Sequence, residues 1–125
     1  MQSLRMTISS SLKYETRKME QNMAKLQENF LHNFAWNGED AYKQAYHVKE
    51  LQKILTDMMV EEDMDKDLEI AEWYIRDYSK FIRRGYNVRE NSTGALHREV
   101  STWKYVVTIE ILDYLEAIVK DYKNI

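Results

Sequence analysis

The sequence contains no cysteine, and this absence removes several kinds of chemistry at once. Without thiols the chain has no disulfide, no thiolate metal site and no cysteine nucleophile. Packing of side chains must therefore hold the fold together, which is typical of proteins inside the cell. We expect a cytoplasmic protein.

Proline is also absent, and there are only three glycines, Gly38, Gly85 and Gly94. Proline interrupts helices because its ring removes a backbone donor and clashes with the preceding turn. Without it, long helices can be interrupted only at the glycines and at polar clusters.

Long hydrophobic runs are missing as well. Nowhere do about 18 apolar residues follow one another, and the N-terminal segment has no apolar run of signal-peptide length. We expect neither a membrane span nor a membrane partner. The 125 residues, 44% hydrophobic and 31% charged, suit one ordinary globular domain covering residues 1–125.

What the chain does have is apolar residues at steps of three and four along four segments. They predict helices over residues 11–36, 39–60, 68–85 and 95–122. Glycine favours the end of a helix, so Asn37-Gly38 should end the first helix and Gly85 the third. Ser92 or Thr93 should cap the fourth.

The first ten residues fit more than one structure. Leu4, Met6 and Ile8 alternate as in a strand, whereas Leu4, Ile8 and Leu12 are spaced as in a helix. A mobile N-terminal arm is a third alternative.

Four helices with short connections predict an all-α protein, a four-helix bundle or a closely related antiparallel arrangement with long first and fourth helices. In an up-down order the first and third connections share one end, which would place Trp36 near residues 83–98. The second connection would lie at the opposite end.

Charge is divided along the chain, although the net charge is only −3. Residues 57–77 contain nine acidic and two basic side chains, and residues 80–104 contain six basic and two acidic ones. The second connection is therefore acidic, and the region around the third is basic.

The stretch from Ile82 to Arg98 is the main candidate site, because it combines four of the seven arginines with two glycines. As a loop it would offer guanidinium groups to phosphates or carboxylates and Tyr86 for stacking on a base. Alternatively it is a solvated loop whose arginines balance the dipole of the third helix. The candidate residues for partner or nucleic-acid binding are Trp36, Lys80, Arg83, Arg84, Tyr86, Arg89, Arg98 and Lys104.

No catalytic, metal-binding or cofactor-binding motif is complete. Glu69-x-x-Glu72 and Glu110-x-x-Asp113 are the kind of carboxylate pair with which all-α nucleotide pyrophosphohydrolases hold magnesium, but the pairs are too far apart in sequence and an upstream pair is missing. No Glu-x-x-His occurs, as a di-iron bundle would require. A glycine-rich phosphate loop is also lacking. We expect no cofactor.

These observations favour a non-enzymatic helical interaction protein that acts through protein–protein contacts and forms homo-oligomers. Methionines at helical spacing, such as Met58 and Met59, suit either a core or an adaptable binding surface. Phe, Tyr, Met, Ile, Asn and Lys outnumber Gly, Ala, Arg and Pro, a bias of AT-rich coding sequence that suggests a phage or mobile-element accessory factor or inhibitor. The alternatives are a nucleic-acid-binding accessory protein that uses the basic loop and, second, a metal-dependent nucleotide hydrolase.

Overall fold

A computed structural model describes the backbone of residues 3–28, 30–61, 63–91 and 95–124, and the side chains of residues 3–24, 39–61, 63–84 and 102–124. It contains four α-helices: α1 (Leu4–Glu28), α2 (Phe30–Val60), α3 (Asp67–Asn91) and α4 (Ala95–Lys123). A short 3-10 helix, η1 (Met64–Lys66), precedes α3. The described residues include no strand. The predicted all-α four-helix bundle is confirmed.

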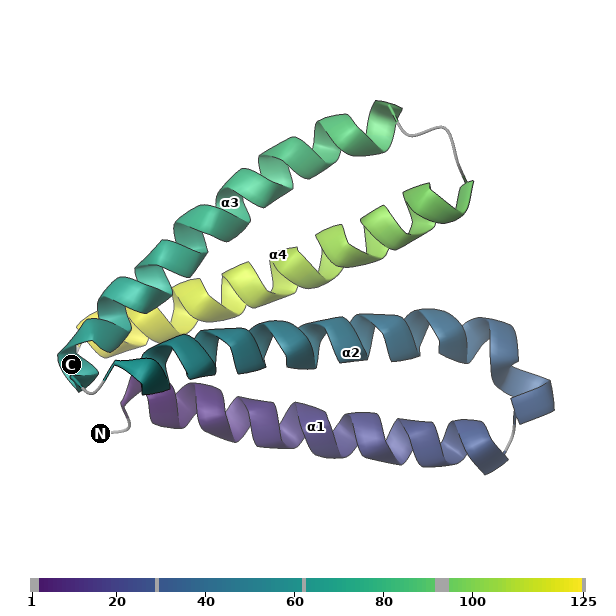
Figure 1. Ribbon diagram of the computed structural model, residues 1–125, viewed down its shortest axis with the longest axis horizontal. Coiled ribbons are helices and arrows are strands. Elements are labelled where there is room, and N and C mark those ends of the chain that lie inside the picture. The colour runs from purple at the N-terminus through teal and green to yellow at the C-terminus, as the bar shows by residue number, and fades with distance from the viewer. Residues whose placement is uncertain (1–2, 29, 62, 92–94, 125) are drawn as a thin grey trace.

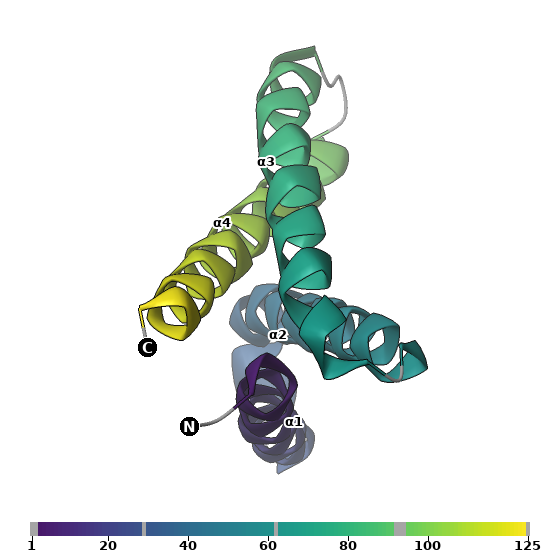
Figure 2. The same ribbon diagram turned by 90° about the vertical axis from the view of Figure 1, so that its left-hand side faces the viewer.

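The helices form two antiparallel hairpins, α1 with α2 and α3 with α4 (Figure 1). The hairpins meet at the end that contains both termini and the α2–α3 corner, a name we use for Met59–Glu61 together with residues 63–66. Toward the other end they diverge, and α3 rises away from α1 and α2 (Figure 2). The acidic second connection lies at the end of the bundle opposite the start of α2, as predicted.

The core occupies the end where the two hairpins meet. Its side chains come from the first half of α1, the second half of α2, the first half of α3 and the part of α4 from Val107 onward. They are Leu4, Ile8, Leu51, Ile54, Met58, Ala71, Tyr74, Tyr78, Val107, Ile111, Leu115 and Val119. Removal of this apolar surface from water is the main force that joins the hairpins.

The N-terminal segment is helical from Leu4 onward. Leu4 and Ile8 are both buried in the core, whereas Met6 is exposed. The helical spacing was therefore the correct alternative, because only a helix places Leu4 and Ile8 on one face and Met6 on another.

Two predicted helix ends are wrong. The chain passes through Asn37-Gly38 and through Gly85 as continuous helix, and no described glycine has a positive φ. Glycine inside a helix costs only about 1 kcal/mol relative to alanine, which a long helix can absorb. As a result α2 is the longest helix with 31 residues, α4 has 29, and α1 is no longer than α3 at 25 residues.

The expected neighbourhood of Trp36 and the basic stretch is also not formed. The end of α3 and the start of α4 lie well away from the start of α2 in both views (Figures 1 and 2). The reason is the divergence of the hairpins, which helix order alone does not determine.

Candidate functional site

The basic stretch predicted as a loop is mostly helix. Residues up to Asn91 belong to α3, and α4 begins at Ala95. Lys80, Arg83 and Arg84 are exposed on α3, and none of them forms an ion pair with another described residue. Their guanidinium and ammonium groups are thus presented by a helix rather than by a loop.

Lys104 differs from these three side chains. It is half-buried on α4, and its Nζ lies 6.0 Å from the centroid of the Tyr46 ring on α2. The neighbouring Trp103 packs on Tyr42 of α2, with ring centroids 5.5 Å apart. Lys104 therefore belongs to an aromatic contact between the hairpins and is not part of one basic surface with Lys80.

Four predicted site residues have side chains outside the described set: Trp36, Tyr86, Arg89 and Arg98. Their backbones lie in α2, α3 and α4. Ser92 and Thr93, the predicted caps of the fourth helix, also lie outside the described residues.

The α2–α3 corner carries an apolar surface. Met59 is 66% exposed, Val60 76% and Met64 48%. The acidic side chains of Asp63 and Asp65 are exposed beside them in the chain. Large apolar side chains that stay uncovered next to charged ones are typical of binding surfaces.

Arg5 holds this corner in place. Its Nε donates to Asp67 Oδ2 at 2.8 Å and its Nη2 to Asp67 Oδ1 at 2.6 Å. The same Nη2 donates to the carbonyl oxygens of Met58 and Glu61, at 3.0 and 3.4 Å. One guanidinium thus ties the start of α1 to the end of α2 and the start of α3. We call these contacts the Arg5 clasp.

Water screens the attraction between Arg5 and Asp67 only weakly, because Asp67 is only 2% exposed. The hydrogen bond to its carboxylate raises the pKa of Arg5 above its ordinary value. A bidentate pair between guanidinium and carboxylate also fixes orientation. The 3-10 helix is held separately, since the Asp63 side chain accepts from the Asp65 amide at 3.0 Å.

A second polar network joins α2 to α3. The Tyr74 hydroxyl donates to Asp57 Oδ2, and the Tyr78 hydroxyl donates to Glu50 Oε2 at 2.8 Å. Lys53 lies between the two pairs: its Nζ is 3.2 Å from Glu50 Oε2 and 5.7 Å from the centroid of the Tyr74 ring. We call this network the tyrosine–carboxylate ladder.

Burial raises the pKa of the Tyr78 phenol above its ordinary value of 10.0, and the charge of Glu50 raises it further. The pKa of the Tyr74 phenol is also raised, chiefly by burial and next by the hydrogen bond to Asp57. Both phenols therefore stay protonated as donors well into the alkaline range. The ladder fixes the register of the two helices, because each hydroxyl has one carboxylate within reach.

Two adjoining cavities of about 300 and 320 Å³ lie among α1, α2 and α4, and Glu15 and His47 line both. Some of the polar side chains that line these cavities bind each other: Asn22 Nδ2 donates to Gln44 Oε1 at 2.9 Å. Among the described side chains, no buried nitrogen or oxygen lacks a hydrogen-bond partner. Neither cavity therefore contains a described group that requires a ligand.

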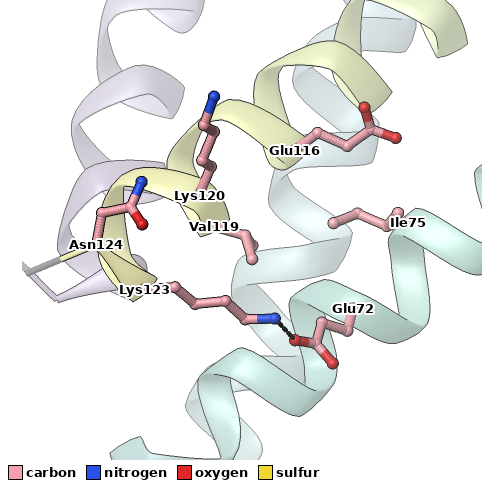
Figure 3. A pocket seen from close by; sticks show the side chains of 7 residues that line it. All are labelled: Glu72, Ile75, Glu116, Val119, Lys120, Lys123 and Asn124. Atoms are coloured by element: carbon pink, nitrogen blue, oxygen red, sulfur yellow. Dashed lines mark ion pairs between the residues drawn. The ribbon is translucent and has the colours of Figure 1, made fainter.

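A third cavity, of about 400 Å³, lies between α3 and α4 near the C-terminus (Figure 3). Ile75 and Val119 point toward each other across it, and Lys123 Nζ pairs with Glu72 Oε1 at 2.8 Å. The ion pair links the two helices and uses the carboxylate of Glu72.

The carboxylate pairs considered for magnesium do not converge. Glu72 lies beside Lys123 between α3 and α4, whereas Glu110 lines the cavity next to α1 and α2. Within the described ranges, no three histidine, aspartate or glutamate side chains could hold a metal ion.

Sequence reasoning missed the Arg5 clasp because its partners are 62 residues apart and carry no shared pattern. The ladder had a signal: Glu50 and Asp57 are two helical turns apart on α2, and Tyr74 and Tyr78 are one turn apart on α3. None of the four helices is long and apolar enough, over its described residues, to cross a lipid bilayer. Comparison with known proteins finds no matching family model, no matching curated protein and no matching solved structure.

Proposed function

We propose that this chain is a non-enzymatic helical interaction protein that presents the α2–α3 corner to a protein partner with a positively charged surface. The observation that carries the proposal is the exposure of Met59, Val60 and Met64 side by side with an acidic segment.

The chemistry of the corner suits such a partner. Methionine is flexible and polarizable, so Met59 and Met64 can adapt to an apolar surface. Asp63 and Asp65 would attract a basic rim and speed the encounter. In the described corner, only Lys66 offers a compensating ion pair, at 3.7 Å from Glu61.

The Arg5 clasp supports the same proposal, since it orders the corner before any partner arrives. Contacts from one guanidinium to Asp67, Met58 and Glu61 reduce the conformational freedom that binding would otherwise have to remove. The cysteine-free composition favours a cytoplasmic setting, and the amino-acid bias typical of AT-rich coding sequence favours a phage or mobile-element origin.

The test is affinity capture from lysate of the source cells with wild-type chain and with the triple variant Met59→Ser, Val60→Ser, Met64→Ser. We expect one or more basic proteins to be retained by the wild type and lost with the variant, with retention falling as salt is raised. A matched control is Met6→Ser with Met23→Ser, which removes exposed methionines from α1.

Retention of the same proteins by the triple variant would contradict the proposal. So would partners that are uniformly acidic. Circular dichroism of each variant checks that the helices are intact, and the corner residues are exposed enough for the fold to tolerate serine.

A second candidate function is nucleic-acid binding. It is favoured by one observation, the exposure of Lys80, Arg83 and Arg84 on α3 without an ion pair to any described residue. Against it stands the net charge of −3, because phosphate binding normally requires a basic balance.

A mobility-shift titration over a range of salt concentrations tests this candidate. Binding that weakens steeply with salt and is lost on combined Lys80→Ala, Arg83→Ala and Arg84→Ala substitution would support it. No shift at low salt, or an unchanged shift with the triple variant, would eliminate it.

A further inference from the structure

We infer that the outer face of α3 binds a second copy of this chain, with the two α3 helices antiparallel. The inference rests on the proposed role as an interaction protein but concerns a surface separate from the α2–α3 corner. In Figure 1, this helix forms the edge of the molecule, and the other three helices lie to one side of it.

The outer face of α3 has an ordered set of charges. Glu69, Trp73, Arg76, Asp77, Lys80 and Arg84 are all exposed. At 100° per residue they fall within an arc of about 100°, so one flat surface can touch them all. None of the five charged side chains forms an ion pair with a described residue.

An antiparallel copy would satisfy these charges in one register. With the two-fold axis between Arg76 and Asp77, each Arg76 faces Asp77 of the second copy. In the same register Glu69 faces Arg84, and Trp73 faces Lys80. Every contact occurs twice, as a two-fold symmetric interface requires.

One shifted register brings like charges together. A shift that sets Trp73 against Arg83 would also set Arg76 against Lys80, bringing like charges together. Like-charge contacts are destabilising and therefore select against that register. The register with its axis between Arg76 and Asp77 is the one that pairs Arg76 with Asp77 and Glu69 with Arg84 at the same time.

Trp73 gives this surface its apolar centre. It is 52% exposed, although its ring packs edge-on against Tyr74, with centroids 5.0 Å apart. Tryptophan is enriched at interface centres, and its face attracts ammonium groups such as that of Lys80. Contact with a second copy would cover this ring.

The helix dipole explains only part of the charge order. It favours acidic residues in the first turn and basic residues in the last, and its effect falls off beyond those turns. Glu69 lies in the first turn of α3, but Arg76, Asp77 and Lys80 lie in the middle of a 25-residue helix. Self-pairing accounts for these three as well.

The contact would be small. From Glu69 to Arg84 the helix rises about 22 Å at 1.5 Å per residue, which is shorter than the span of most stable dimer interfaces. We therefore expect a weak, salt-sensitive dimer that forms at high protein concentration.

The experiment uses two charge-reversed full-length chains, Glu69→Arg and Arg84→Glu, studied by sedimentation equilibrium at several hundred micromolar in low salt. Wild type should dimerise. Each variant alone should be monomeric, with association weakened about tenfold or more, because both symmetric contacts become repulsive. An equimolar mixture should form a heterodimer, since arginines on one chain then face glutamates on the other.

Control variants Glu20→Arg and Lys13→Glu reverse exposed charges on α1 and should leave dimerisation unchanged. A monomeric wild type, unchanged dimerisation of both α3 variants, or failure of the mixture to associate would each overturn the inference. Thermal unfolding of every chain confirms that it is folded. Affinity capture by the same α3 variants separates this outcome from that of the corner, because loss of the dimer should leave partner retention intact.

Discussion

The inner and outer faces of α3 differ in whether their polar side chains are paired with other described residues. On the inner face, the Tyr74 and Tyr78 hydroxyls each reach a carboxylate of α2. On the outer face, Arg76, Asp77 and Lys80 have no ion-pair partner among the described residues. Polar groups that are buried must be paired for the fold to form, whereas exposed ones are available for a partner.

The inner face of α3 should therefore contribute to stability and the outer face to binding. Substitutions on the inner face should change the free energy of unfolding, and substitutions on the outer face should change association.

The largest effect is expected for Tyr78→Ala, which removes a buried ring and leaves the buried Glu50 without its hydroxyl donor. We expect a loss of about 3–5 kcal/mol in the free energy of unfolding. Trp73→Ala on the outer face should cost about 1 kcal/mol or less. Urea denaturation of both variants measures the difference, and equal losses would break the separation of the two faces.

The second largest loss of stability is expected when the Arg5 clasp is broken. Asp67→Ala removes a buried carboxylate and frees the guanidinium that joins three helices, so the melting temperature should fall by several degrees. Asp63→Ala, which affects only the 3-10 helix, should have a smaller effect. In a double-mutant cycle, Arg5→Ala and Asp67→Ala should be less than additive. Full additivity would show that the two side chains act independently.

The ladder predicts a pH dependence on the alkaline side. Because the folded-state pKa values of Tyr74 and Tyr78 lie above 10.0, their contribution to stability is complete below pH 10 and is lost as the pH rises through the folded-state values. The double variant Tyr74→Phe, Tyr78→Phe should be less stable at neutral pH by about 1–3 kcal/mol per lost hydroxyl.

The same double variant should also lose less stability between pH 9 and pH 11, because phenylalanine does not titrate. Denaturation midpoints across this range provide the measurement. Tyr14→Phe is the matched control, since Tyr14 is exposed and its substitution should leave the alkaline slope unchanged. An unchanged slope in the double variant would contradict the assignment.

The smallest effect on the monomer is expected at the middle of the outer face. Lys80→Ala should change the free energy of unfolding by about 0.5 kcal/mol or less. The same substitution removes the predicted contact to Trp73 of a second copy, so it should still weaken dimerisation. A stability loss as large as that of Tyr78→Ala would show that the outer face takes part in folding.

The sequence predicted the architecture well and the local boundaries less well. Apolar residues at steps of three and four identified four helices, and the N-terminal alternatives included the correct one, with Leu4 and Ile8 in the core. The predicted stops at Gly38 and Gly85 failed because the cost of one glycine is small beside the hydrogen bonds of a long helix.

The candidate site was harder to predict. Lys80, Arg83 and Arg84 are exposed as expected, but they belong to a helix, and Lys104 is engaged with Tyr46. Met58 and Met59 divide between the two roles considered for methionine, one fully buried and the other 66% exposed. Adjacent residues on a helix point about 100° apart, so which of them faces the core depends on the neighbouring helices.

The sequence by itself determined the helical class, the acidic corner and the absence of thiol chemistry, because composition and periodicity are local properties. Only the tertiary structure decided that Arg5 meets Asp67, that the hairpins diverge, and that Glu50 and Asp57 face tyrosines of α3. These contacts join residues far apart in the chain, and their geometry depends on how side chains of four helices pack together.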